Sequence, residues 1–257
     1  MTSLPGDLAP VTVLLERWAG AVRALAPAAP VGEVEAAGRG LLSRWDERHR
    51  RYHGRRHLTE VLDAVDALAA ETALPEREAA LARLAAWLHD AVYEAPAAAA
   101  RGETPPPEAD ERASAALGSA VLAGLGVPPG EVARVAALVA ATAGHDPVAP
   151  DRTTAVVVDA DLWVLGAAPE RFDGYCREVR EEYAHVDEPA YRQGRRAVLE
   201  PLLARPSLYL TAAARERWEP DARTNLRREL SRLAGPAPAR PAATRTGART
   251  VPRTPPA

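Results

Sequence analysis

The sequence predicts an all-α protein. Through most of the chain apolar residues recur at the three- and four-residue spacing of an amphipathic helix, and we find no convincing alternation of apolar and polar residues of the kind that marks a half-buried strand. Alanine and leucine are abundant and β-branched residues are few, which favours helix. The 257 residues are 47% hydrophobic, enough for a sizeable core. We expect one helical domain over 1–235.

Four helices are predicted in the first part of the chain, at 11–25, 32–48, 57–70 and 76–94. In 57–70 the leucines and valines form one stripe and the acidic residues lie outside it. The segment 76–94 follows Pro75, a residue typical of a helix start, and is apolar almost all round. We therefore expect 76–94 to be a buried, central helix.

Residues 95–107, APAAAARGETPPP, contain too many prolines to continue that helix and are predicted to form a surface loop that could cover a site. Further helices are predicted at 108–124, 129–143, 153–166, 168–185, 188–204, 207–217 and 219–234. The segment 236–257 has no periodicity and six prolines, and its composition predicts disorder.

Charge and composition exclude several classes of protein. A net charge of −3 argues against a dedicated nucleic-acid binder. The single cysteine, Cys176, excludes an internal disulfide and a cysteine-based zinc cluster. We find no signal peptide at the start of the sequence and no apolar run long enough to span a membrane. The expectation is a cytoplasmic protein with no membrane partner.

A His–Asp pair, His89 and Asp90, lies inside the apolar stretch LAAWLHDAVYE. Burying such side chains is costly unless they are hydrogen-bonded, paired or bound to a metal. The dipeptide alone decides nothing, because His145 and Asp146 form a second one. The pair is either a satisfied structural feature or a place that holds a ligand.

Three other segments carry side chains of the metal-ligand type. His53 and His57 are four residues apart in RYHGRRHLTEV, His145 follows an apolar helix, and Asp159 and Asp161 lie in VVVDADLWVLG. Imidazole and carboxylate together suit a divalent transition metal. Carboxylates buried on different helices repel each other, and a cation removes that penalty.

The order His, His-Asp, Asp on separate helices resembles the HD superfamily of metal-dependent phosphohydrolases, and more closely a bacterial subfamily of predicted phosphohydrolases. The resemblance covers about 45–230 and rests on RYHGRRHL, AAWLHDAVY, ERASA, ATAGHDP, DADLWVLG, VREEYAHV, YRQGRRAVL and ARTNLRREL. It implies an HD-type helical bundle with its metal-site core at about 40–170 and with extra N- and C-terminal helices around it.

The resemblance also implies the ligands and the chemistry. The metal ligands would be His57, His89, Asp90 and Asp161, and the signature DADLWVLG favours Asp161 over Asp159. The reaction would be hydrolysis of a phosphate ester or anhydride of a small molecule, with a nucleotide as the leading substrate class. The ion stays open among Mn, Fe, Co, Ni, Zn and Mg, and nitrogen ligands lean away from Mg alone.

Further residues are candidates for catalysis or for binding the substrate. Beside Asp90, the catalytic candidates are Glu111 and His145, and the candidate substrate contacts are His53, Arg180 and Arg195. Each also has an ordinary structural interpretation: a solvated acid, a histidine at a helix C-terminus, a core or capping histidine, or arginines paired with glutamates between helices. Asp110 stands before Glu111 where the family has asparagine, which affects the rim of the site and not the metal ligands.

Two rival hypotheses remain. A non-catalytic HD-type module could sense a metal or a nucleotide without turning it over; Glu111 and His145 would then not face the metal. A purely structural helical scaffold would leave residues 57, 89, 90 and 161 without a common focus.

Overall fold

The computed structural model describes residues 9–103, 106 and 108–234, and within these ranges it contains helices and no strand. The all-α prediction is confirmed. The elements are α1 Val11–Leu25, α2 Val31–Trp45, α3 Arg55–Glu71, α4 Glu76–Leu88, α5 Ala95–Ala100, α6 Ala109–Gly124, α7 Pro129–Ala140, α8 Arg152–Asp161, the 3-10 helix η1 Leu162–Gly166, α9 Pro169–Glu182, α10 Glu188–Ala204 and α11 Ala212–Leu233. The segment 236–257, predicted to be disordered, lies outside the described residues.

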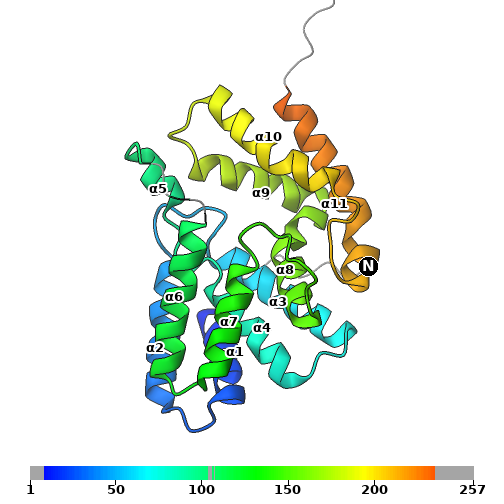
Figure 1. Cartoon of the computed structure of the whole chain (residues 1–257). Helices are drawn as coiled ribbons and strands as arrows, with labels where there is room; N and C mark the ends of the chain where they lie inside the picture. The colour runs from blue at the N-terminus through cyan, green and yellow to red at the C-terminus, as the bar shows by residue number, and fades with distance from the viewer. Residues whose placement is uncertain (1–8, 104–105, 107, 235–257) are drawn as a thin grey trace, which may run out of the picture.

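Helices α3, α4 and α8 lie at the centre of the fold. In Figure 1, α1, α2, α6 and α7 are grouped on one side of these helices, and α9, α10 and α11 on the other. Helix α4 packs against α1, α3, α7 and α8, as expected for a central helix. No helix among the described residues is long and apolar enough to cross a membrane.

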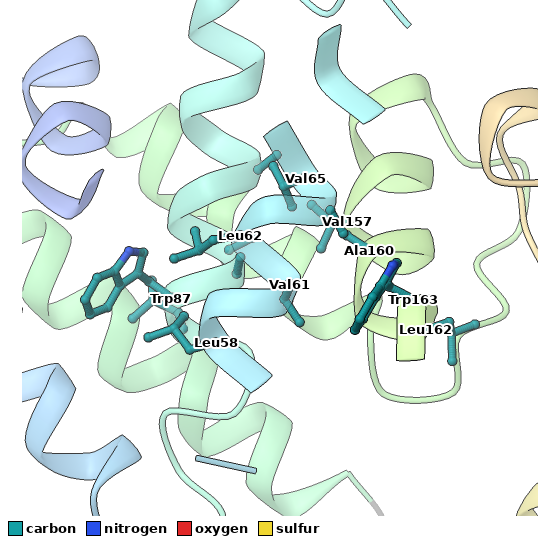
Figure 2. Packing of buried hydrophobic residues seen from close by; sticks show 14 of the residues in the cluster. Leu58, Val61, Leu62, Val65, Trp87, Val157, Ala160, Leu162 and Trp163 are labelled. Carbon is teal, nitrogen blue, oxygen red and sulfur yellow. The ribbon is translucent and has the colours of Figure 1, made fainter. Parts of the chain in front are cut away.

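The core is a continuous cluster of buried side chains that extends from Leu14 to Leu233. Figure 2 shows its central part, where the apolar stripe of α3 meets α4, α8 and η1. The side chains of Leu58, Leu62 and Trp87 have no exposed surface. Burial of one such large side chain contributes about 1.5–3 kcal/mol, so the contact among these helices is the main source of stability around the candidate site. The prediction of a single domain over 1–235 stays a prediction.

The prediction that one helix covers 76–94 is wrong beyond Leu88, where α4 ends. Continuing the helix would require the carbonyl groups of Asp90 and Ala91 to accept from amides four residues later. The Arg50 guanidinium donates to both carbonyl groups instead, at 2.7 and 3.4 Å. The amide of Glu94 donates to the carboxylate of a residue in α6. The turn after α4 is therefore set by a side chain from another part of the chain.

Other predicted boundaries also differ, including the helix start predicted at 207, which lies at Ala212. Residues 95–100, predicted as loop, form α5; alanine favours helix, and a proline in the first turn costs no helical hydrogen bond. The predicted break between 217 and 219 is absent, and α11 continues through Pro220. Its buried residues Trp218, Ala222 and Leu226 pack toward η1 along one helix face, which keeps the helix continuous. Residues 162–166, predicted as part of the α-helix 153–166, adopt 3-10 geometry.

Gly166, at the end of η1, permits a close approach of α11. A Cβ added there would lie 2.7 Å from the backbone carbonyl oxygen of Trp218, which cannot move away alone. We expect Gly166→Ala to lower the free energy of unfolding by about 1–3 kcal/mol, measured by urea denaturation. The control is Gly20→Ala in α1, where an added Cβ meets nothing within 4 Å. This variant should raise the free energy of unfolding by up to about 1 kcal/mol, because alanine favours helix more than glycine does. Equal effects of the two variants would contradict the steric interpretation.

Candidate metal centre

Four predicted ligands from three central helices meet at one point. His57 lies in the first turn of α3, His89 and Asp90 follow the last residue of α4, and Asp161 is the last residue of α8. The Nε2 atoms of His57 and His89 are 3.1 Å apart. The Oδ1 atom of Asp161 lies 3.2 Å from the first of these nitrogens and 3.3 Å from the second. The Oδ2 atom of Asp90 lies 3.7 and 3.3 Å from them.

These distances suit a shared metal ion. Ligand atoms bound about 2.1 Å from an ion are about 3.0 Å apart along an octahedral edge and about 3.4 Å along a tetrahedral edge. Four of the five distances above, 3.1–3.3 Å, fall within that range, and the fifth, from His57 to Asp90, is 3.7 Å. The donor set of two imidazoles and two carboxylates is one that divalent transition metals bind. The residues therefore fit the group that the sequence predicts.

The histidine at the end of α4 is held in the tautomer that a metal needs. Nδ1 of His89 lies 2.9 Å from the carbonyl oxygen of Ala86. Because a carbonyl can only accept, Nδ1 carries the proton and donates it. In the neutral ring, Nε2 then presents its lone pair to Asp90, Asp161 and His57. A hydrogen bond of this kind is usual behind a metal-bound histidine.

The charges of the cluster shift the pKa of each member. Burial lowers the pKa of His89, but the carboxylates of Asp90 and Asp161 outweigh it and raise that pKa well above the ordinary value. Burial also lowers the pKa of His57, and Asp161 offsets only part of this effect. For Asp90 and Asp161, burial favours the neutral form, yet the charge of His89 holds both pKa values below the usual range. The raised pKa of His89 favours a proton on this ring, which offsets part of the charge of the two carboxylates.

The structure separates the roles of the two aspartates in α8. The carboxylate of Asp159 accepts hydrogen bonds from the amides of Leu210 and Thr211 and from the Thr211 hydroxyl, each at 2.7 Å. Thr211 is the residue that caps α11. Asp159 thus holds the start of α11, and Asp161 is the aspartate that reaches the cluster.

Beside the cluster lies a cavity of about 660 Å³, a size typical of small-molecule sites. Its lining includes His57, Asp90 and Asp161, and also four other predicted site residues: His53, Glu111, His145 and Arg195. Five of the six tyrosines of the chain line it too: Tyr52, Tyr93, Tyr175, Tyr183 and Tyr191. The structure therefore brings most of the predicted residues to one cavity.

His145 contacts the cluster directly. Its Nε2 lies 2.8 Å from Oδ2 of Asp161, so this carboxylate faces His57 and His89 with one oxygen and His145 with the other. The backbone of His145 has a φ of 52°, a left-handed conformation that is costly for a side-chain-bearing residue. Arg205 donates to the carbonyl groups of His145 and Gly144, at 2.6 and 2.8 Å, and holds the turn in place.

Glu111 lies in the first turn of α6 and is half-buried at the edge of the cavity. Burial raises its pKa, and the nearby charge of Asp90 raises it further. The raised pKa of Glu111 is closer to the neutral pH at which acid–base catalysis by a carboxyl group is effective.

Sequence reasoning missed Glu182, the buried last residue of α9. One carboxylate oxygen accepts from the amides of Arg51, Tyr52 and His53, at 2.7–2.9 Å. The other lies 2.7 Å from Nδ1 of His53. Glu182 therefore fixes both the backbone that precedes α3 and the imidazole ring of His53 in the cavity wall. Sequence reasoning also missed Arg50. Both residues bind groups that are far from them in the sequence, so no local pattern indicates their roles.

The structure does not bring Arg180 to the cavity. Its guanidinium donates to the carbonyl groups of Tyr183 and Val186, at 2.7 and 3.1 Å, and pairs with Glu188. It closes the C-terminal end of α9 and the turn that follows. Arg180 thus has the structural role of an arginine paired with a glutamate between helices, and it does not contact the cavity.

Comparisons of the chain with family models, with curated proteins and with solved structures found no match.

We expect metal binding to release about one proton at pH 7, because a metal binds neutral imidazole and His89 is protonated in the metal-free protein. Titration calorimetry with MnCl₂ in buffers of different ionisation enthalpy measures this release. His89→Gln should abolish it. A binding heat that does not depend on the buffer would contradict the assignment of His89 as the protonated member of the cluster.

We expect Glu182→Gln to lower the free energy of unfolding at pH 7 by on the order of 2 kcal/mol, since charged hydrogen bonds are lost. Burial favours neutral Glu182, but hydrogen bonding to His53 and to backbone amides lowers its pKa. Its contribution is therefore present above the ordinary glutamate pKa of about 4.3 and is lost as the pH falls through the lowered value. Urea denaturation across this range should show the wild type and the variant converge toward acid pH. A constant difference would argue against this linkage.

Proposed function

We propose that the protein is a cytoplasmic, metal-dependent phosphohydrolase of the HD type that acts on a phosphate ester or anhydride of a small molecule, with a nucleotide as the leading substrate class. The observation that carries this proposal is the meeting of His57, His89, Asp90 and Asp161 within 3.1–3.7 Å at the wall of a cavity. The order of these residues along the chain, which resembles that superfamily, supports it.

His57, His89, Asp90 and Asp161 would hold a divalent ion, one of Mn, Fe, Co, Ni, Zn or Mg. A bound ion of this kind supplies an acidified water and a positive charge for a phosphoryl oxygen. Asp90 combines a place in the cluster with a place in the cavity lining, so it would orient a water that attacks the substrate.

Proton transfer falls to groups at the edge of the cluster. Glu111, with its raised pKa, can take a proton from water or give one to the departing oxygen. His145 is held by Asp161 and can donate to a phosphoryl oxygen or stabilise developing negative charge. Because both residues line the cavity, a catalytic role is favoured over a sensor without second catalytic groups.

The first test is metal content by elemental mass spectrometry, together with hydrolysis of p-nitrophenyl phosphate and a panel of nucleotides. We expect wild-type protein to hold one or two transition-metal ions per chain and to hydrolyse at least one substrate. The double variant His89→Ala/Asp90→Ala should lose both properties, and Asp90→Asn should lose activity with less disturbance of the fold. The matched control is Asp146→Ala, which changes the exposed aspartate of the second His–Asp pair and should behave as wild type.

Glu111→Gln separates binding from catalysis in the same experiment. It should keep the metal and lower kcat by about 10²-fold or more. Metal binding without turnover of any substrate would favour the sensor hypothesis. Wild-type protein that takes up no Mn, Zn or Fe(II) would overturn the proposal.

A further inference from the structure

The guanidinium of Arg195, in α10, is largely buried. Its Nε and Nη2 atoms are inaccessible to solvent and have no hydrogen-bond partner. Among the described residues no carboxylate forms an ion pair with it. Its neighbours on the same helix behave differently: Arg192 pairs with Glu188 at 2.7 Å, and Arg196 pairs with Glu200 at 2.6 Å. Arg195 alone of the three lines the cavity.

An unpaired cation of this kind costs free energy in the folded protein, because water no longer solvates it. Part of the cost is offset by Tyr175, since the Arg195 guanidinium lies over the ring at 4.8 Å from its centroid. This contact leaves the edge of the guanidinium that carries Nε and Nη2 without an acceptor. That edge is the fork of donors which matches the two oxygens of a carboxylate or a phosphate.

Among the described residues, Arg195 forms no ion pair or hydrogen bond with a candidate metal ligand. Aromatic contacts lead from it to the cluster in steps: Tyr175 packs on Tyr52 with ring centroids 4.6 Å apart, and Tyr52 packs on His57 at 4.7 Å. An oxyanion bound by Arg195 is therefore a different group from one bound beside His57.

We propose that Arg195 forms a second anion subsite in the cavity, which takes a phosphate or carboxylate group at the non-reacting end of the substrate. The inference rests on the proposed function and narrows it: the substrate carries two anionic groups, joined by a part that lies against the rings of Tyr52 and Tyr175. One group lies at the metal centre and reacts, and the other pairs with Arg195 and sets specificity.

The test uses full-length protein stripped of metal, with the chelator removed by dialysis, so that the subsite is measured without the metal centre. Titration calorimetry with inorganic phosphate and with succinate gives the dissociation constant of each anion. We expect wild type to bind at least one of them. Arg195→Met should weaken that binding by about 10- to 100-fold, the equivalent of a charged hydrogen bond. The anion bound more tightly identifies the class of the second group.

Arg196→Met, on the same helix at an arginine paired with Glu200, is the matched control and should bind as wild type. Arg195→Lys keeps the charge but loses the fork, so it should bind with intermediate affinity and gives a readout if the methionine variant does not fold. Anion binding that is equal in wild type and Arg195→Met, or absent from wild type, overturns the subsite. Binding through Arg195 in a protein that takes up no metal would instead retain the subsite and overturn the hydrolase.

Discussion

The structure around the cavity is organised by one electrostatic constraint: the carboxylates of Asp90 and Asp161 each lie 3.2–3.7 Å from two buried imidazoles, largely shielded from water. Two neighbouring carboxylates repel, and only a positive charge between them makes the arrangement stable. The proton on His89 meets this need in the metal-free protein, and a divalent ion would meet it more completely. Because α3, α4 and α8 each contribute part of the cluster, the packing of these helices in the core fixes its geometry.

Two buried side chains, Arg50 and Glu182, fix the backbone around the cluster. Both involve the short connection between α2 and α3. Arg50, within this connection, holds the turn that carries Asp90, and Glu182 holds the connection itself through three backbone amides. Each forms several hydrogen bonds at once, which compensates for the burial of its charge. The polar network thus links the ends of α4 and α9 to the start of α3.

Regular features could be predicted from the sequence, whereas long-range ones could not. Periodicity placed most helices, and the order of His57, His89, Asp90 and Asp161 indicated residues that the structure brings together. The sequence does not predict the end of α4, because Arg50, 40 residues before Asp90, binds carbonyl groups of the turn that follows the helix. Glu182 acts on residues about 130 positions away, and a motif does not tell which arginine of α9 or α10 turns inward.

The two aspartates of α8 have a consequence for the modularity of the chain. Asp159 is fully buried, and its hydrogen-bond partners are Leu210 and Thr211. A fragment restricted to about 40–170 would contain every ligand of the cluster but would remove the amide and hydroxyl partners of this carboxylate. It would also lack the α9 and α10 residues that enclose the cavity. The ligand-bearing region therefore does not form an independent module. A chimera that joins it to another C-terminal region must provide hydrogen-bond donors to Asp159 in place of those at the start of α11.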